Sequence, residues 1–226
     1  MMHTRAIAWA AAFAVVAAVA CSKDESHDTR KAPAPAKTEA AKPATSAAAP
    51  AAASPLAEVA GTYEIDPTHT QVIFRVKHLG VSYQYGRFNK TSGKLSLDAD
   101  PAKSSVELTI DAGSVYTADQ KRDTHLKSPD FFDVKQFPQI TFKSTRVKAL
   151  GGNKFEVAGD LTLHGTTKPV TLQAELTGSG KDPWGGFRVG FEARTKVKRS
   201  DFGMTFMLDG LGDEVDIMAT LEAVKK

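Results

Sequence analysis

The stretch FRVGFEARTKVKRSDFGM (Phe187–Met204) decides the fold class. Apolar or small residues occupy every second position from Phe187 to Val197, and charged residues occupy most of the positions between them. Because side chains alternate between the two faces of a strand, this pattern predicts one buried face and one solvent-exposed face. Arg199 is the next residue on the buried face, where an unpaired guanidinium is costly. The stretch therefore predicts a half-buried strand with a buried polar group at its end.

The same period of two recurs along most of the chain. The inward-facing rows are Val72, Phe74, Val76 and His78; Val106, Leu108 and Ile110; Phe155, Val157, Leu161 and Leu163; Val170, Leu172, Ala174 and Leu176; and Val215, Ile217, Ala219, Leu221 and Ala223. With TYEID, GKLSLD and QITFKS they predict eight or nine strands. Clean alternation is typical of antiparallel sheets. So many consecutive strands in ~170 residues must close into a barrel or split into a sandwich to remove their edges.

One region, SVYTADQKRDTHLKSPDFFDVKQFP, breaks the alternation. Thr117 and Gln120 have the spacing of a capping box and predict a short helix after them. The following SPDFFD segment predicts a second short turn that carries Phe131 and Phe132. The insert is compatible with a lid over one end of a barrel and with a plug that seals its core, and both readings stay open.

The N-terminus has the features of an exported protein. Arg5 precedes the uncharged, mostly apolar run Ala6–Ala20, which is short for a membrane span and suits a signal peptide. The run ends at Cys21, the only cysteine of the chain, so no intramolecular disulfide is possible. AVAC resembles the lipobox of bacterial lipoproteins, so we expect a signal peptide over residues 1–20 and lipidation of Cys21. Ordinary cleavage after the A-x-A sequence 18–20 is the alternative.

A polar, low-complexity segment follows the cysteine. Ala, Pro, Lys, Thr, Ser and Glu dominate it, with no strong apolar residue before Leu56. It cannot bury enough surface to offset its ordering entropy, so we expect a lipidated N-terminus and disordered tether over residues 21–56. One domain over 57–226 would follow. An aspartate directly after the lipidated cysteine resembles the signal for inner-membrane retention, but this chain has Ser22 at that position. We therefore expect a periplasmic protein anchored to the outer membrane, or a soluble periplasmic one if Cys21 is not lipidated.

The charge of the domain is nearly balanced. Of 29 Lys and Arg and 26 Asp and Glu, six and four respectively lie before residue 57, which leaves 23 basic and 22 acidic residues. Nucleic-acid binding requires a clustered basic face with interleaved aromatic residues. We therefore expect no nucleic-acid partner.

Five segments together resemble the YceI-like family of periplasmic polyisoprenoid-binding proteins. They are YEIDPTHTQVIFRVKHLG (63–80), GRFNKTSGKLSLD (86–98), KRDTHLKSPDFFDVKQFPQITFKS (121–144), GDLTLHGTTKPV (159–170) and RSDFGM (199–204). The resemblance implies an all-β fold, an extended, lipocalin-like eight-stranded antiparallel barrel with the helical insert near one end. It also implies a long channel that holds an isoprenoid, quinone-like or other amphiphilic chain, with no established catalytic residues.

The inward rows would then line this channel. Arg199 and His78 each end such a row, where they would either meet the polar end of the ligand or be satisfied structural groups. For Arg199, the structural alternative is pairing with Asp123 or with backbone carbonyls. Phe131 and Phe132 are expected near the mouth. The expected ligand-binding residues are His78, Arg199, Phe74, Val76, Leu108, Phe131, Phe132, Phe142, Leu161, Leu172, Phe191 and Ile217.

Other classes of function find less support in the sequence. DFG at 201–203 lacks the other kinase motifs, and no G-x-S-x-G elbow is present. The histidines lack zinc-ligand spacing, so we expect no metal and no cofactor apart from a bound isoprenoid or quinone-like lipid. The expected function is binding of an amphiphilic lipid for periplasmic transport, storage or sequestration, without catalysis; a homodimer is compatible with it. A barrel isomerase or hydrolase and a structural envelope protein with a filled core are the alternatives.

Overall fold

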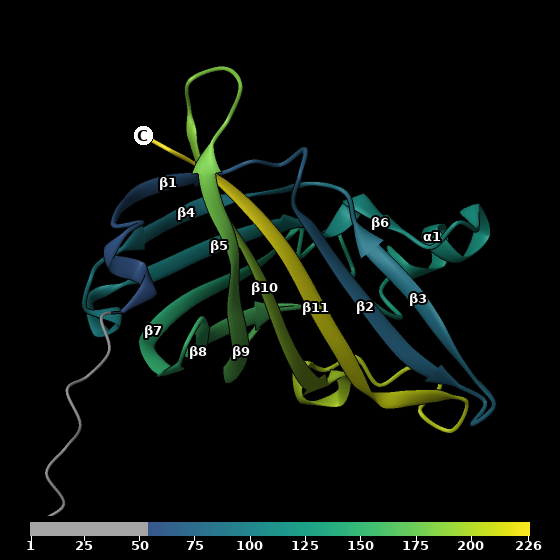
Figure 1. Ribbon diagram of the computed structural model, residues 1–226. Helices are drawn as coiled ribbons and strands as arrows, with labels where there is room; N and C mark the ends of the chain where they lie inside the picture. Colours follow the sequence, from purple (N-terminus) through teal and green to yellow (C-terminus); the bar gives the residue numbers. More distant parts are fainter. Residues whose placement is uncertain (1–53) are drawn as a thin grey trace, which may run out of the picture. The chain divides into compact units, whose positions relative to one another are not determined.

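The computed structural model describes residues 54–226, and Figure 1 shows them as a barrel of long strands. The predicted signal peptide, Cys21 and the tether up to residue 53 lie outside the described residues. Within residues 54–226, no helix has the length and apolar character needed to cross a membrane. The strands are β1 Gly61–Ile65, β2 Gln71–His78, β3 Ser82–Phe88, β4 Thr91–Leu97, β5 Ser105–Asp111, β6 Val115–Tyr116, β7 Gln139–Gly151, β8 Lys154–Leu163, β9 Thr166–Lys181, β10 Phe187–Lys198 and β11 Leu211–Lys225. The helix is α1 Gln120–Leu126, and the short 3-10 turns are η1 Pro55–Ala57, η2 Pro101–Lys103, η3 Ala112–Ser114 and η4 Arg199–Phe202.

The strands form one antiparallel sheet that closes on itself. The closed ring runs β1-β4-β5-β7-β8-β9-β10-β11, and β11 pairs back with β1. This is the predicted all-β, eight-stranded antiparallel barrel. The 15-residue β11 makes closure possible, because its C-terminal part pairs with β1 at Ala223 and its middle pairs with β2 at Ala219. Strands β2, β3 and β6 extend the sheet beyond β11, as the right-hand side of Figure 1 shows.

Strand β10 has the alternation that its sequence predicts. Val189 and Val197 are buried, whereas Arg194, Lys196 and Lys198 are exposed. The register places residues of one inward row opposite those of the next, so the barrel interior is lined by the alternate positions of each strand.

The insert forms the predicted short helix and turn, but with a different cap. Asp119, not Thr117, caps α1, and its Oδ1 accepts a hydrogen bond from the backbone N–H of Arg122 at 2.8 Å. Thr117 instead donates its hydroxyl to Asp123 Oδ1 at 2.6 Å. Thr117 lies outside the helix and holds Asp123, a residue of its first turn, through this bond and through its backbone N–H. The following turn closes through the carbonyl of Ser128, which accepts from the backbone N–H groups of Phe131 and Asp133.

The folded unit begins earlier than composition predicts. Composition assigns Leu56 to the tether, but its side chain is buried within the barrel core. Ser54 Oγ accepts from the backbone N–H of Leu56 and caps η1, with Pro55 in its first turn. Leu56 and Val59 bury nearly all of their surface, and this burial stabilises the packing of the segment onto the barrel.

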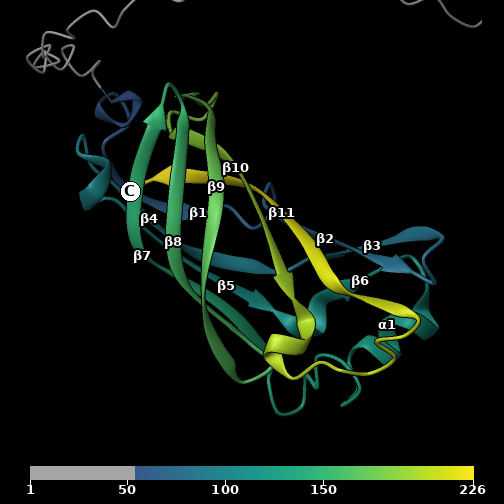
Figure 2. The same cartoon turned by 90° about the horizontal axis from the view of Figure 1, so that it is seen from below.

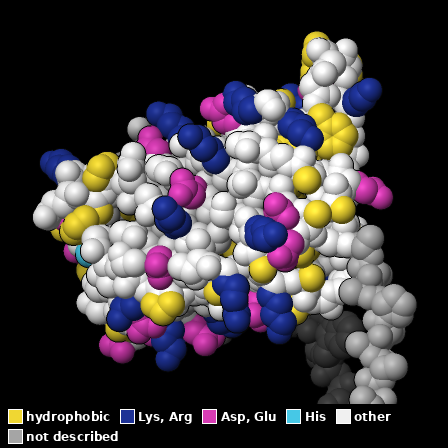
Figure 3. Space-filling view, turned by 90° about the vertical axis from the view of Figure 1, so that its left-hand side faces the viewer, with side chains coloured by type: hydrophobic (Ala, Val, Ile, Leu, Met, Phe, Trp, Pro, Cys, Tyr) yellow, Lys and Arg dark blue, Asp and Glu magenta, His cyan; other side chains and the backbone are white. Residues whose placement is uncertain are grey.

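Basic and acidic side chains are interspersed on the surface. Figure 3 shows this mixture on the side that faces left in Figure 1, with small separate apolar areas between the charges. This face carries no single-sign patch of the kind that nucleic acids bind.

Candidate functional site

The barrel interior holds two adjoining apolar chambers. The proximal chamber lies at the insert end and is lined by residues such as Phe74, Ile140, Phe132, Val197 and Ile217. The distal chamber continues toward the opposite end and is lined by residues such as Leu97, Val106, Phe155, Phe191 and Leu221. The cavity volume open to water-sized molecules is about 160 Å³ in the proximal chamber and about 100 Å³ in the distal chamber. A single water needs only ~10–15 Å³ on this measure, so the interior is not packed solid.

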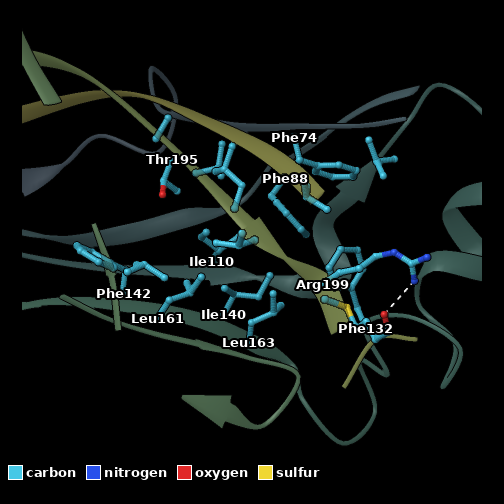
Figure 4. A pocket seen from close by; sticks show the side chains of 18 of the residues that line it. Phe74, Phe88, Ile110, Phe132, Ile140, Phe142, Leu161, Leu163, Thr195 and Arg199 are labelled. Carbon is cyan, nitrogen blue, oxygen red and sulfur yellow. Dashed lines mark hydrogen bonds between the residues drawn. The ribbon is translucent and has the colours of Figure 1, made fainter. Parts of the chain in front are cut away.

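Most of the predicted site residues surround the proximal chamber (Figure 4). The residues placed there are Phe74, Val76, Leu108, Phe131, Phe132, Phe142, Leu161, Leu172, Ile217 and Arg199. Phe191 lines the distal chamber instead. The inward rows of period two therefore supply many of the wall residues of both chambers.

His78 does not line either chamber, contrary to the expectation that it ends an inward row near a ligand. It is the last residue of β2, where it pairs with Leu211 of β11 and Ser82 of β3. The register of β11 against β2 is irregular between Leu211 and Val215. Leu211, the β11 partner of His78, lines the proximal chamber, whereas His78 itself does not.

The two chambers meet at a junction whose wall residues belong to both. Leu108, Phe142, Leu172, Ala193 and Ala219 contribute to the walls of both. Ala193 of β10 pairs with Ala219 of β11 on one side and with Ala174 of β9 on the other. Three adjacent strands thus present a methyl group at the same level, which keeps the passage open where larger aliphatic residues would fill it.

The insert covers the proximal chamber without filling it. Phe132 packs edge-on against Phe88 and Phe74 of the extended sheet, with ring centroids 5.4 and 6.4 Å apart. Phe131 packs edge-on against Phe206 of the loop after η4, with ring centroids 5.4 Å apart. Figure 2 shows α1 and this loop at the same end of the barrel. Because the insert contributes wall residues to an open chamber, its geometry is that of a cover rather than a plug.

Arg199 is tied to backbone carbonyls. Its side chain is 3% exposed, and Nε donates to the carbonyl of Gly212 at 3.0 Å. Nη1 donates to the carbonyls of Met204 at 2.9 Å and Phe206 at 2.8 Å, and Nη2 donates to that of Leu211 at 2.6 Å. The guanidinium has five N–H groups, so these bonds occupy four of them. Figure 4 shows the guanidinium turned away from the apolar side chains.

Bonding to backbone carbonyls is one of the two structural roles expected for Arg199. The other, pairing with Asp123, does not occur, because the hydrogen bonds of Arg199 go to carbonyls and Asp123 Oδ1 accepts from Thr117. Burial lowers the pKa of the Arg199 guanidinium, and the nearby Asp213 carboxylate acts in the opposite direction. Arg199 therefore fixes the loop between η4 and β11, which forms part of the cover of the proximal chamber.

Thr195 is a polar residue that also lines the proximal chamber. It occupies an inward position of β10 that the alternation identifies, although its residue type gave no reason to assign it to a site. Its hydroxyl donates to the carbonyl of Thr171 at 2.9 Å. Among the described residues that line the chambers, the only titratable side chains are Arg194 and Arg199.

A charged network lies where β10 begins and β11 ends. Arg188 Nη1 lies 2.7 Å from Asp66 Oδ2 and 2.6 Å from Glu222 Oε1, and its Nε lies 2.9 Å from Asp182 Oδ2. Hydrogen bonds from Thr68, Arg188 and His69 hold the pKa of Asp66 well below its usual range. Asp66, His69 and Glu222 are close enough to share a cation, but the Arg188 guanidinium already occupies their carboxylate oxygens. The network is thus accounted for as a set of ion pairs.

Comparison with known proteins agrees with this architecture. A family model described as a YceI-like domain matches residues 63–223. A UPF0312 protein of Yersinia pestis is 45% identical over 170 residues, which are 74% of this chain and 88% of that protein. A UPF0312 protein of Yersinia enterocolitica has the same identity and coverage.

Three solved structures are similar. BcnA of Burkholderia cenocepacia is 29% identical with a TM-score of 0.64, covering 70% of this chain and 98% of that one. The YceI protein of Campylobacter jejuni is 34% identical with a TM-score of 0.59, covering 66% and 90%. A polyisoprenoid-binding domain from Saccharophagus degradans is 17% identical with a TM-score of 0.57, covering 73% and 98%, and shares the fold.

The closed antiparallel barrel with an apolar interior defines a lipocalin-like protein. The sequence match across nearly the whole barrel makes the assignment narrower, and the chain belongs to the YceI-like family.

Proposed function

We propose that the barrel binds the apolar chain of an isoprenoid, quinone-like or other amphiphilic lipid, and that it serves in periplasmic transport, storage or sequestration. The observation that carries the proposal is the pair of adjoining apolar chambers along the barrel interior. An empty apolar cavity inside a well-packed barrel lowers stability, because its lining atoms lack contacts. A bound hydrocarbon chain would restore those contacts.

Burial of the chain accounts for affinity. Each five-carbon isoprene unit removed from water contributes up to ~4 kcal/mol at ~0.8 kcal/mol per methylene-sized group. The polar end of the ligand has few partners in the chamber, since Arg199 uses four N–H groups on the protein's own carbonyls. We therefore infer that the protein selects ligands by the shape and length of the chain more than by its head group.

The chamber walls favour binding over catalysis. A general acid–base reaction needs a group that can release or take up a proton within hydrogen-bond reach of the substrate. The titratable side chains among the described wall residues are arginines, which stay protonated in proteins. The related fold of the polyisoprenoid-binding domain from Saccharophagus degradans is consistent with a binding function. A structural protein with a filled core is disfavoured by the open interior.

We further propose that Cys21 is diacylated and anchors the protein to the outer membrane on its periplasmic side. The support is the sole cysteine at the end of an apolar N-terminal run. Intact-mass measurement of the mature protein extracted from membranes should give an N-terminal cysteine carrying acyl chains. An unmodified N-terminal residue would contradict this part of the proposal.

Blocking the passage between the chambers tests lipid binding. Ala193→Trp places a large ring where three alanines meet, so the delipidated variant should fold but lose affinity for a long polyprenol by about tenfold or more. Ala149→Trp, at an exposed position of β7, is the matched control and should bind like the wild type. Fluorescence titration measures both. Equal affinity of Ala193→Trp and wild type would refute the proposed site.

A further inference from the structure

The far end of the distal chamber is closed by a segment that precedes the family domain. The family match begins at residue 63, but Leu56 of η1 contributes to the wall of this chamber. Its side chain is only 2% exposed. A residue outside the range that the family model matches thus borders the space available to a ligand.

The segment around Leu56 is held firmly in place. Ser54 caps the turn, and the hydroxyl of Tyr63 donates to the carbonyl of Val59 at 2.6 Å. Tyr63 and Val59 are almost fully buried, yet neither lines a chamber. Leu56 therefore presents its side chain to the chamber from a fixed support, and a ligand cannot displace it without breaking this packing.

The chamber ends at the level of Leu56. On β9, β10 and β11 the next inward residues are Leu176, Val189 and Ala223, which are buried and line neither chamber. Each of these residues is two positions from an inward residue of the same strand, on the side of this end. Leu176 follows Ala174, Val189 precedes Phe191, and Ala223 follows Leu221. Solid packing at these positions stops a chain from passing farther along the barrel.

The distal chamber suits an apolar chain end rather than a head group. Its most buried polar wall residue is Ser104, whose Oγ accepts a hydrogen bond from the backbone N–H of Asp98 at 3.0 Å. The other named wall positions, such as Leu97, Phe155 and Leu221, are hydrocarbon. A polar head in this chamber would lose its hydrogen bonds to water without replacement.

We propose that the distal chamber is a separate compartment for the terminal part of the bound isoprenoid chain, and that Leu56 sets the greatest chain length that fits. This inference rests on the proposed lipid-binding function. A chain longer than the space that ends at Leu56 must leave its excess units in water at the opposite end. Each excess unit therefore adds no affinity.

The test measures the affinity of the delipidated mature protein for all-trans polyprenols of increasing length. In the wild type, affinity should rise with each added unit and then level off. Leu56→Ala should move this limit to a longer polyprenol by about one five-carbon unit, with about tenfold higher affinity for that polyprenol. Leu56→Phe should move the limit to a shorter one.

Val59→Ala is the matched control, since it truncates a buried residue of the same segment that lines no chamber. It should leave the limit unchanged. If Leu56→Ala does not fold, Leu56→Val and Leu56→Phe carry the comparison in both directions. Identical limits in wild type and folded Leu56 variants would overturn the role of Leu56, whereas a wild type that binds no polyprenol would overturn the proposed function itself.

Discussion

Replacement of Arg199 by methionine distinguishes a structural role of this arginine from a role in binding the head group of a ligand. The change keeps an unbranched side chain against the chamber but removes four hydrogen bonds to the carbonyls of Met204, Phe206, Leu211 and Gly212. At a net value of ~1 kcal/mol for each bond, the free energy of unfolding should fall by about 3–4 kcal/mol, because some carbonyls regain water. With a urea slope of ~2 kcal/mol/M, the unfolding midpoint should fall by about 1.5–2 M.

The matched control is Arg146→Met on β7. Arg146 is 66% exposed and makes one ion-pair contact with Glu156 at 3.5 Å, so its loss should change stability by less than ~0.5 kcal/mol. Urea unfolding followed by circular dichroism gives both values. The relative affinity for a quinone-headed ligand and a hydrocarbon of equal length should be the same in Arg199→Met and wild type. A wild-type midpoint combined with a lost preference for the quinone head would refute the structural role.

Two further changes test other parts of the structure. Gly86→Ala should lower stability and reduce affinity for a polyprenol, because a Cβ at this position overlaps the ring of Phe74, a wall residue of the proximal chamber. Gly178→Ala is the control, since a Cβ there meets no other atom. Equal thermal unfolding of the two variants would contradict the prediction. The pKa of Asp66 is lowered in the folded state by hydrogen bonds from Thr68 and Arg188, so its stabilising contribution is present above its unfolded pKa of ~3.9 and is lost as the pH falls below that value. Arg188→Met should therefore show a smaller loss of unfolding free energy between about pH 5 and pH 3 than the wild type, as measured by urea unfolding at each pH. An equal loss would contradict the contribution of Arg188.

The alternation of residues carries most of the information about this fold. Phe191, Ala193 and Thr195 follow one another on the inner face of β10, and the same rule places Leu172 and Ile217 on the chamber wall. This prediction is reliable for antiparallel strands with one solvent-exposed face, because a shift of the register by one residue would turn every apolar side chain outward.

Features that depend on contacts between distant segments are less accessible from sequence. The inward row of β2 predicts His78 in the site, but of the pair His78 and Leu211 only Leu211 lines the proximal chamber. Arg199 is recognisable as a buried polar residue, whereas its carbonyl partners follow from the path of the loop to β11. Leu56 is hidden in a low-complexity composition, and only its packing against the barrel end shows its place.

The most direct test of lipid binding is analysis of what the protein carries when it is isolated. Protein purified from its native cells should be extracted with organic solvent and the extract examined by mass spectrometry, with Ala193→Trp treated in parallel. We expect about one molecule of a chain-bearing amphiphile per protein in the wild type and much less in the variant. An equal lipid content in both preparations, or none in the wild type together with no uptake of added polyprenol, would contradict the account of the barrel as a lipid-binding site.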